Sequence, residues 1–431
     1  MLDIRLLRED AERVRRGLAA RNGRFDVDAI VELDARRRKL MTEAETLKGE
    51  RNAVSKRIGA RKKAGEDTAA EQAAMRQIGE RIAALDAEAR SVEADRDGRL
   101  LSLPNIPHAS VPAGADASSN AVVRAWGAPR AFDFEPRSHV ELMTRLGIVD
   151  FERSARMAGS GFPLLMGAGA RLQRALIQFM LDLHTGEHGY TEVEPPFLCN
   201  AAAMTGTGQL PRLADDVYRV DPDGLYLVPT AEVPLTNLFR EEIIAAPLPI
   251  RLTACTPCFR REAGAAGRDT RGLIRVHQFD KVEMVRFVEP ERSYDELESL
   301  VGDAEDVLRR LGLPYRAVLL CAGDLGHCAA KCYDLELWAP GQNAWLEVSS
   351  CSNFEDYQTR RAGIRYRRPD GRVAYPHTLN GSGVALPRLM VALMENGQQA
   401  DGSVVLPEAI RPYVGGLERL VPPAAGGAAS P

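Results

Sequence analysis

Two heptad runs near the start of the chain constrain its fold more than any other feature. The first run places mostly apolar side chains at alternating gaps of three and four residues: Ile30, Leu33, Arg37, Leu40, Ala44, Leu47, Arg51, Val54 and Ile58. The second run keeps the same spacing: Met75, Ile78, Ile82, Leu85, Ala89 and Val92. This spacing is typical of the seam of a coiled coil, so both runs predict long helices.

The segment KKAGEDT separates the two runs, and its Gly65 with polar neighbours predicts a turn. Helices joined by such a turn fold back on each other, so residues 28–98 are expected to form an antiparallel hairpin. Two helices of about 35 residues would make an arm about 50 Å long. A shorter helical stretch precedes this arm and is expected to end at Asn22-Gly23.

The surface of the arm has two interpretations. The first is a charged hairpin that is exposed to solvent and packs against something or mediates dimerisation. Basic residues nevertheless crowd the outer part of the first helix, with Glu50 as the only acid from 48 to 63: Lys48, Arg51, Lys56, Arg57, Arg61, Lys62 and Lys63. A basic stripe on a rigid lever suits contacts with the phosphates of an extended nucleic acid.

Composition and cysteine usage exclude several classes of protein. Lys and Arg number 56 against 60 Asp and Glu, so a nucleic-acid partner must be met by a local patch. The N-terminus, MLDIRLLREDAERVRR, lacks the apolar run of a secretory signal, and no run of about 18 apolar residues occurs. We therefore expect a soluble cytoplasmic protein with no membrane segment. Seven scattered cysteines, an odd number, predict reduced thiols without disulfides.

Turn-forming residues mark the domain boundary. The stretch LPNIPHASVPAGADASSN predicts a linker at 103–120, between an N-terminal domain at 1–102 and a second domain at 121–420. A flexible tail is expected at 421–431. In the second domain, strand-like segments such as PIRLTACTPCF and AWLEVSSCS cluster together rather than alternating with helices. This arrangement predicts an α+β fold with an antiparallel sheet flanked by helices.

The densest charge lies in CFRREAGAAGRDTRGLIRVHQFDKVE. Basic and acidic residues surround its glycine loop: Arg260, Arg261, Glu262, Arg268, Asp269, Arg271, Arg275 and Glu283. The segment is either an exposed ion-paired hairpin or a polyanion site. Arginine forks grip phosphate in two places, and Phe279 offers a ring face to a base. No GxxxxGK[ST] or GxGxxG motif is present, so any nucleotide is bound without a P-loop or dinucleotide fold.

Further motifs complete this pattern: LPNIPH, TGTGQLP, TAEVPLTN, GRDTRGLIRVHQF, SSCSNFEDYQ and HTLNGSG. Together with the arm they resemble the bacterial-type seryl-tRNA synthetase family, a class II aminoacyl-tRNA synthetase family. The resemblance runs through nearly the whole chain. It implies a class II antiparallel sheet, a homodimer, and an arm that embraces the serine tRNA. The implied reaction activates L-serine with ATP to seryl-adenylate, releasing pyrophosphate, and transfers serine to the 3′ adenosine of serine tRNA, and also of selenocysteine tRNA.

The resemblance also implies roles for individual residues. Arg260 on the α-phosphate and Arg388 on the γ-phosphate are the expected catalytic residues. The expected serine-binding residues are Thr230, Ala231, Glu232, Glu283, Thr378, Asn380 and Ser382. The expected ATP-binding residues are Arg260, Arg261, Glu262, Arg275, Val276, Phe279, Glu347, Val348, Ser349, Ser350 and Arg388. Glu347 and Ser350 would also meet the Mg²⁺ that accompanies ATP. The tRNA would contact Arg51, Lys56, Arg57, Arg61 and Lys62.

Three positions depart from the usual family pattern. Gly161 stands where an arginine is common, and Leu346 replaces the arginine often found before Glu347. Pro387 precedes Arg388 where glycine is frequent, which is tolerable because proline is favoured in the first turn of a helix. These departures motivate a second hypothesis, a pathway-dedicated or inhibitor-resistance paralogue that makes seryl-adenylate or seryl-tRNA.

The arm favours the tRNA ligase over that paralogue. A paralogue that transfers serine to a carrier protein would not need a long helical arm for binding tRNA. A catalytically inactive adaptor is a third hypothesis, against which the retained Arg260, Glu283 and Arg388 weigh.

The cysteines also permit a zinc interpretation. His327-Cys328 with Cys332, and Cys255 with Cys258, have spacings seen in metal sites. A tetrahedral zinc site needs four convergent ligands, so a buried thiol cluster is preferred and no zinc is expected.

Overall fold

The computed structural model describes residues 1–263 and 271–423 and divides the chain into two compact units. The first unit comprises Leu2–Ala19 and Gly23–Pro104. The second comprises Met1, Ala20–Asn22 and the chain from Asn105 onward. Arg268, Asp269 and the tail from 424 lie outside the described residues, so the expectations at those positions are not addressed.

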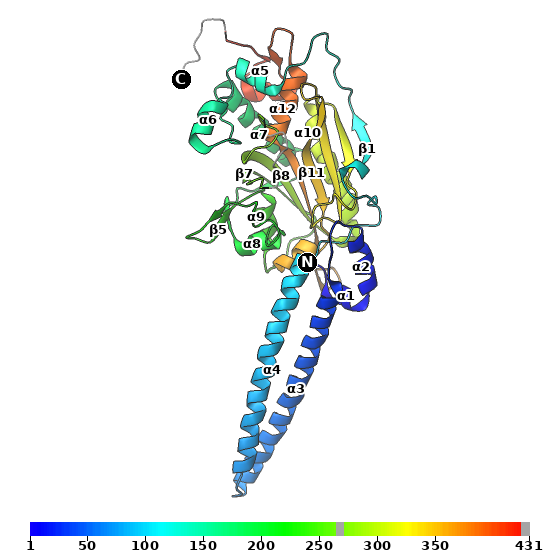
Figure 1. Ribbon diagram of the computed structural model, residues 1–431, viewed down its shortest axis with the longest axis vertical. Coiled ribbons are helices and arrows are strands. Elements are labelled where there is room, and N and C mark those ends of the chain that lie inside the picture. The colour runs from blue at the N-terminus through cyan, green and yellow to red at the C-terminus, as the bar shows by residue number, and fades with distance from the viewer. Residues whose placement is uncertain (264–270, 424–431) are drawn as a thin grey trace. The chain divides into compact units, whose positions relative to one another are not determined.

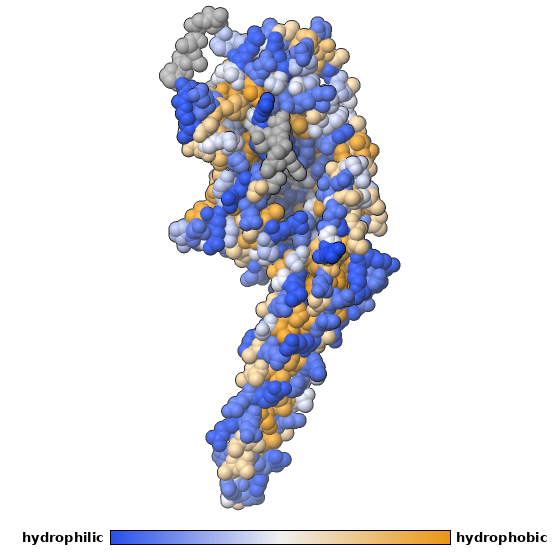
Figure 2. All heavy atoms as spheres, in the orientation of Figure 1, coloured by the Kyte–Doolittle hydropathy of each residue, from blue (hydrophilic) through white to orange (hydrophobic). Residues whose placement is uncertain are grey.

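The first unit is helical and contains the predicted hairpin. Its helices are α1 (Ile4–Glu9), α2 (Ala11–Ala19), α3 (Val27–Lys63) and α4 (Ala69–Ser102). Helices α3 and α4 lie side by side (Figure 1), and Leu40 and Ala44 pack with Leu85 and Ala89 between them. Apolar side chains follow the length of the arm in Figure 2. The coiled-coil prediction is therefore confirmed.

Local sequence explains where the arm begins and turns. The Asp26 side chain accepts a hydrogen bond from the Ala29 amide at 3.0 Å, which caps the first turn of α3. Gly65 adopts a φ of +76° in the connecting turn, a conformation that glycine reaches without strain.

The basic stripe on α3 has acidic neighbours that the sequence places far away. Glu71 on α4 pairs with Arg57 at 3.3 Å and with Arg61 at 2.9 Å. Lys56 and Lys62 are exposed. The scarcity of acids from 48 to 63, where Glu50 is the only one, therefore does not mean that the stripe lacks acidic partners in space.

The second unit is built on an eight-stranded sheet in the order β1-β9-β10-β11-β14-β8-β7-β2. In that order the strands are Ala121–Trp126, Tyr315–Leu319, Lys331–Ala339, Ala344–Asn353, His377–Ala385, Gln278–Val288, Ile250–Phe259 and Thr191–Glu192. Neighbours pair antiparallel, except that β2 runs parallel to β7. The predicted α+β fold with an antiparallel sheet is confirmed.

Helices cover one face of this sheet. They are α5 (His139–Arg145), α6 (Phe151–Ala158), α7 (Ala168–Gly186), α10 (Ser293–Arg310) and α12 (Leu386–Gly397). Helices α7, α10 and α12 lie near strands β8 and β11 in Figure 1. Their side chains form one core with Val282 and Met284 of β8. Val285 and Phe287 of the same strand belong to a different core, because successive side chains of a strand point to opposite faces.

Shorter elements surround the second face. They are β3 (Leu198–Asn200), α8 (Ala201–Gly206), β4 (Arg219–Val220), β5 (Leu225–Leu227), α9 (Glu232–Thr236), β6 (Ile243–Ile244), α11 (Tyr357–Ala362), β12 (Arg365–Arg367) and β13 (Val373–Ala374). Two other short strands, β15 (Val404–Val405) and β16 (Arg419–Leu420), pair with each other and add Val404 and Leu420 to the core beneath the helices. Single 3₁₀ turns span Ala117–Ser119, Asn237–Phe239, Pro290–Arg292, Glu408–Ile410 and Pro412–Val414.

The segment expected to be a linker is held against this unit from Asn105 onward. The side-chain amide of Asn105 donates hydrogen bonds through Nδ2 to the backbone carbonyls of Cys328 at 3.0 Å and Phe354 at 2.8 Å. All seven cysteines are free, as predicted. Among the described residues, no helix combines the length and the apolar character needed to span a bilayer.

Candidate active site

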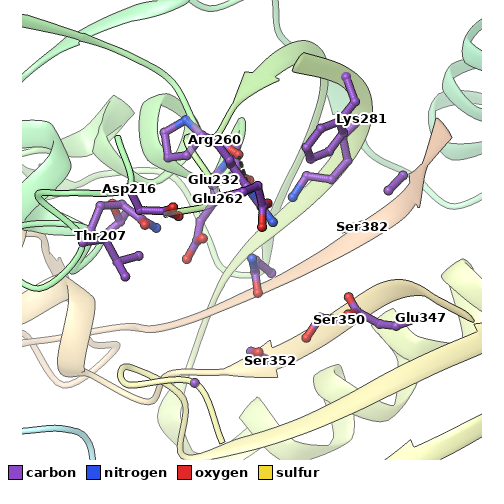
Figure 3. Close-up of a pocket in the computed structure, with 18 of the residues that line it drawn as sticks. Thr207, Asp216, Glu232, Arg260, Glu262, Lys281, Glu347, Ser350, Ser352 and Ser382 are labelled. Atoms are coloured by element: carbon purple, nitrogen blue, oxygen red, sulfur yellow. Dashed lines mark hydrogen bonds between the residues drawn. The ribbon is translucent and has the colours of Figure 1, made fainter. Parts of the chain in front are cut away.

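A cavity of about 630 Å³ opens on the sheet. Its floor is formed by alternate residues of three strands, namely Lys281 on β8, Ser350 on β11 and Ser382 on β14. The intervening residues Val282 and Cys351 belong to the core beneath the helices. The cavity therefore lies on the face opposite α7, α10 and α12. In Figure 3, Arg260, Glu232 and Glu262 lie on one side of the strand that carries Ser382, and Ser350 and Glu347 lie on the other.

Arg260 follows the last residue of β7 and is held by its backbone and by an aromatic ring. Its amide donates to the His277 carbonyl at 2.9 Å, and its Nε donates to the Pro229 carbonyl at 3.3 Å. The guanidinium lies 5.3 Å from the centre of the Phe279 ring. These contacts leave its terminal nitrogens directed at the cavity, where a planar fork can grip an oxyanion in two places.

Three further arginines line the same cavity, namely Arg212, Arg275 and Arg388. Arg275 forms an ion pair with Glu262. Arg388, in the first turn of α12, donates to the Ile274 carbonyl at 3.0 Å and to the Glu347 carbonyl at 2.8 Å. Pro387 lies in the first turn of α12, which confirms the prediction that a helix begins there. Several guanidinium groups around one cavity, those of Arg260, Arg275 and Arg388 among them, are suited to a polyphosphate.

Carboxylates dominate another part of the cavity. Glu232 is buried and accepts a hydrogen bond from Gln358 Nε2 at 2.6 Å. Burial, together with the negative charge of Glu283, raises the pKa of Glu232 to about 7. Glu283 itself pairs with Lys281 at 2.8 Å and accepts from Asn380 Nδ2 at 2.9 Å. This region therefore holds more negative than positive charge and is suited to an ammonium group.

One polar atom in this region lacks a partner. Asn380 Oδ1 is buried and accepts no hydrogen bond from any described residue, although Asn380 lines the cavity. A buried acceptor without a partner is destabilising unless a ligand or water supplies a donor. It is therefore suited to the hydroxyl or ammonium group of a small ligand.

Most of the expected site residues lie together around the cavity. Those that line it are Thr230, Glu232, Arg260, Glu262, Arg275, Val276, Phe279, Glu347, Val348, Ser350, Asn380, Ser382 and Arg388. Five other expected residues are not among the lining residues: Ala231, Arg261, Glu283, Ser349 and Thr378. The expected tRNA-binding residues, Arg51, Lys56, Arg57, Arg61 and Lys62, belong to the arm.

The residues outside the lining have identifiable contacts. Ala231 is fully buried, whereas Arg261 is exposed. Thr378 donates to Gln358 Oε1 at 2.7 Å, and Ser349 donates to the Ser382 carbonyl at 2.6 Å. Any effect of Thr378 or Ser349 on a ligand is therefore transmitted through the residue that each one contacts.

The structure also places residues at the site that the sequence did not single out. Lys281 and Thr207 line the cavity, and Gln358 lies behind it between Glu232 and Thr378. Thr207 lies within TGTGQLP and Gln358 within SSCSNFEDYQ, so both motifs contained the signal without indicating which member matters. Lys281 lies two residues from both Phe279 and Glu283, and the period of a strand would have placed it on the same face.

Glu347 and Ser350 suit a divalent cation. Both line the cavity, and carboxylate and hydroxyl oxygens are the kind of ligand that Mg²⁺ prefers. Asp334 on β10 lies opposite Ser350, and burial together with the charge of Glu347 raises the pKa of Asp334 well above its usual value. Glu347 itself pairs with Arg388 Nη1 at 3.3 Å, so its carboxylate already has a positive neighbour.

The cysteines do not gather around a metal. Within the described ranges, no cluster of three or more His, Cys, Asp or Glu side chains is arranged to hold an ion. Cys328 Sγ contacts the Thr207 carbonyl at 3.5 Å, and Cys332 Sγ contacts Ser350 Oγ at 3.1 Å. Burial raises the pKa of Cys328 to about 11, so its thiol stays protonated at neutral pH.

Comparison with known proteins agrees with this geometry. Residues 1–107 match the seryl-tRNA synthetase N-terminal domain, and residues 218–397 match the tRNA synthetase class II core domain (G, H, P, S and T). The serine–tRNA ligase of Thermomicrobium roseum is 57% identical over 422 residues, which cover 97% of this chain and 95% of the relative. That of Geobacillus kaustophilus is 55% identical and covers 96% of this chain and 99% of the relative. The chain belongs to the seryl-tRNA synthetase family.

Solved structures of seryl-tRNA synthetases have the same fold over almost the whole chain. The Pyrococcus horikoshii enzyme, solved with ATP, is 39% identical with a TM-score of 0.92, covering 98% of this chain and all of that one. The Naegleria fowleri cytoplasmic enzyme, solved with AMP, is 30% identical with a TM-score of 0.87. It covers 98% of this chain and 99% of that one. The chain is thus a serine–tRNA ligase, a class II aminoacyl-tRNA synthetase, as the sequence motifs indicated.

Proposed function

We propose that the cavity binds ATP along its arginines and L-serine against its carboxylates, so that seryl-adenylate forms where the two regions meet. The observation that carries this proposal is the separation of charge within one cavity. Arg260, Arg275 and Arg388 suit phosphates, whereas Glu232 and the unpaired oxygen of Asn380 suit an ammonium or hydroxyl group.

The first step needs placement and charge stabilisation rather than a general base. The carboxylate of serine is already ionised at neutral pH and attacks the α-phosphorus, while the bond to pyrophosphate breaks. Charge then builds on the phosphate oxygens, and preorganised arginines lower the barrier by meeting that charge. Arg260 is assigned to the α-phosphate and Arg388 to the γ-phosphate. The Phe279 ring, against which Arg260 lies, is assigned to the adenine base.

Serine is recognised by polar groups that are buried. Glu232 is assigned to the ammonium group, with Thr230 beside it. Asn380 Oδ1 and the pair formed by Glu283 and Ser382 are assigned to the hydroxyl. A pocket built for a hydroxyl leaves buried polar groups unpaired when alanine binds, and this penalty gives selectivity. Thr378 supports the pocket indirectly, because its hydroxyl fixes Gln358.

The metal and the remaining partners follow from the same assignment. Mg²⁺ entering with ATP would be held by Glu347 and Ser350, where it would neutralise phosphate charge. Lys56, Lys62, Arg51, Arg57 and Arg61 are assigned to the phosphates of the tRNA. We further propose a cytoplasmic homodimer that charges serine tRNA and also selenocysteine tRNA.

The deciding experiment measures ATP–pyrophosphate exchange by the purified chain with each of the standard amino acids. Serine should drive exchange far better than threonine or alanine. Better exchange with either of those would refute the assignment of the serine pocket.

A second experiment separates the two activities. A variant lacking residues 30–92 should still form adenylate but should lose useful charging of serine tRNA, because the cavity residues all lie beyond residue 200. If that variant charges tRNA as fast as the full chain, the arm does not bind tRNA. Intact exchange by the full chain without charging of serine tRNA would favour the pathway-dedicated paralogue.

A further inference from the structure

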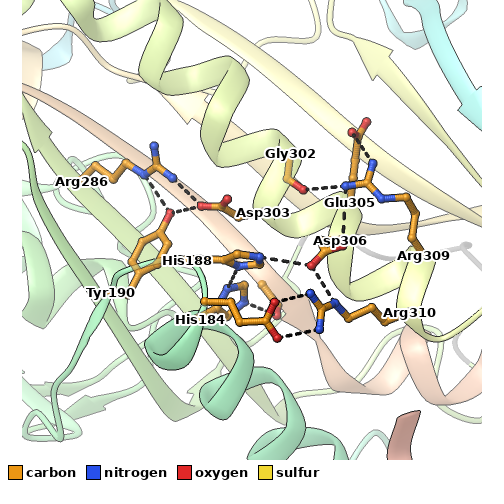
Figure 4. A network of polar contacts seen from close by, with 12 residues as sticks. His184, His188, Tyr190, Arg286, Gly302, Asp303, Glu305, Asp306, Arg309 and Arg310 are labelled. Atoms are coloured by element: carbon orange, nitrogen blue, oxygen red, sulfur yellow. Dashed lines mark hydrogen bonds and ion pairs between the residues drawn. The ribbon is translucent and has the colours of Figure 1, made fainter. Parts of the chain in front are cut away.

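Two histidines lie behind the sheet, on the face covered by helices. His184 is near the end of α7 and is fully buried, and His188 follows two residues after that helix (Figure 4). His184 Nε2 lies 3.0 Å from the Gly383 carbonyl oxygen, and His184 Nδ1 lies 3.0 Å from His188 Nδ1. His188 Nε2 lies 3.2 Å from Asp306 Oδ2 on α10. A continuous chain of polar contacts therefore joins β14 to α10.

The chemistry of these groups fixes the number of protons on the two rings. A carbonyl oxygen only accepts, so His184 Nε2 must carry a proton. Asp306 Oδ2 accepts a hydrogen bond from Arg310 Nε at 2.8 Å and so acts as an acceptor, which means that His188 Nε2 must carry a proton as well. The contact between the two Nδ1 atoms needs a third proton. Two neutral imidazoles hold only two protons, so the pair carries one positive charge.

The environment places this charge on His188. Burial lowers the pKa of His184 to about 4, so that ring stays neutral. His188 Nε2 lies 3.2 Å from the carboxylate of Asp306, so a positive charge on this ring has a counter-ion beside it. The other charged groups around the pair are already engaged with one another. Arg286 binds Asp303 and Glu296, Arg310 binds Glu187 as well as Asp306, and Arg251 binds Glu296.

The backbone group held by this pair lies in an irregular part of β14. Regular pairing with β8 ends at Ser382, opposite Glu283, and resumes at Ala385, opposite Lys281. Gly383 and Val384 form the irregularity between them, and the Gly383 carbonyl is satisfied by His184. A Cβ atom on Gly383 would lie 2.4 Å from His184 Nε2, so the approach requires glycine.

This irregularity connects two parts of the proposed active site. Ser382 lines the cavity immediately before it, and α12 begins at Leu386 and carries Arg388 into the same cavity. Movement of the Gly383 carbonyl would therefore change the position of both side chains. Displacements of about 1 Å at a distance from the reacting atoms can slow a reaction by about a hundredfold.

We propose that His184 and His188 are positioning residues, which share one extra proton and use it to hold β14 at Gly383 so that Ser382 and Arg388 are correctly placed. When the pair loses that proton, the two Nδ1 lone pairs face each other and one of the three contacts breaks. Amino-acid activation then slows as pH rises past the point of proton release. The positioning role rests on the functions proposed for Ser382 and Arg388, whereas the proton count does not.

The proton count is tested on the unmodified full chain by NMR with ¹⁵N-labelled histidine. At pH 7, His188 should have both ring nitrogens protonated, and His184 should have only Nε2 protonated. Spectra of His184→Gln and His188→Gln assign the signals. Two neutral rings at pH 7 would overturn the proposal, whatever reaction the cavity performs.

The positioning role is tested by the pH dependence of kcat for serine-dependent pyrophosphate exchange. In the wild type, kcat should fall at the pH where NMR shows the pair releasing its proton. In His184→Gln the amide nitrogen replaces Nε2 as the donor to Gly383 and does not titrate, so this fall should disappear. Asp306→Asn removes the carboxylate that stabilises the imidazolium and should move the fall to lower pH.

Two further variants sharpen the result. His184→Phe removes the donor and should lower kcat at every pH, on the order of tenfold. His108→Gln changes a half-buried histidine that contacts Ser110 and Tyr294, away from the pair, and should keep the wild-type profile. If His184→Phe does not fold, His184→Gln and the NMR titration still decide the question. Coincident pH profiles for the wild type and His184→Gln would overturn the positioning role and leave the ligase function intact.

Discussion

Replacing Glu232 by glutamine should stabilise the protein at alkaline pH, because the fold opposes ionisation of this carboxyl. Burial and the charge of Glu283 raise its pKa from 4.5 to about 7. The folded chain therefore binds this proton more tightly than the unfolded chain, and stability is lost as pH rises from 4.5 to 7. Above that window the penalty is complete and amounts to about 3 kcal/mol.

Thermal unfolding at two pH values measures this effect. At pH 8, Glu232→Gln should be about 3 kcal/mol more stable than the wild type, or about 6 °C in Tm, and at pH 5 the gain should be below about 1 kcal/mol. The glutamine can still accept the hydrogen bond from Gln358, so no contact is lost. Glu152→Gln, whose carboxylate is exposed, is the matched control and should change Tm at neither pH. An equal change at both pH values, or a loss at pH 8, would refute the reasoning.

The same substitution should impair serine binding. Removing one partner of a buried charge pair costs about 2–5 kcal/mol, so the KM for serine should rise at least about thirtyfold while the KM for ATP changes little. In the wild type the KM for serine should also rise as pH falls below about 7, because the protonated carboxyl no longer attracts the ammonium group. Glu232→Gln should lack this pH dependence. A variant that binds serine normally would show that the ammonium group lies elsewhere.

Three other substitutions test separate parts of the molecule. Arg260→Ala should slow activation by at least about a hundredfold, or about 2.7 kcal/mol, with an unchanged Tm, and near-normal exchange would refute its role. The double variant Lys56→Glu, Lys62→Glu should weaken tRNA binding and lower the slope of log affinity against log salt concentration by about two. An unchanged slope would mean that these two lysines face solvent and do not contact the tRNA. Gly161→Ala should slow activation, because its Cβ would lie 2.5 Å from His277, and unchanged kcat would contradict this.

The arm was predictable because its information is local. A heptad repeat specifies one helical face, and a single turn decides that the two faces meet, so the sequence placed Leu40 and Leu85 on the two faces that pack together. The charges on its surface were less predictable. Arg57 and Arg61 pair with Glu71, and this contact depends on the register between α3 and α4, which the repeat alone does not fix.

The candidate site was predictable in its residue types more than in its contacts. The motifs point to Arg260 and Arg388, because these arginines stand at positions where the family's motifs have one. They do not show that Thr378 contacts Gln358 rather than the cavity, because that contact depends on how α11 packs beside β14. The sequence did not single out His184, and the role proposed for it depends on an irregularity in β14 that no local pattern reveals.

Gly161 shows how a departure from the family pattern can be accommodated without loss of the arginines. It adopts a φ of +80°, and its carbonyl accepts a hydrogen bond from the His277 amide at 2.8 Å. His277 in turn accepts from the Arg260 amide at 2.9 Å and contacts the Arg260 carbonyl through Nδ1 at 3.0 Å. The missing side chain leaves the space that the His277 ring occupies, and that ring fixes the backbone of Arg260. The substitution therefore changes the support of Arg260 and keeps the arginine that we propose for the α-phosphate, as expected of a working ligase rather than of an inactive adaptor.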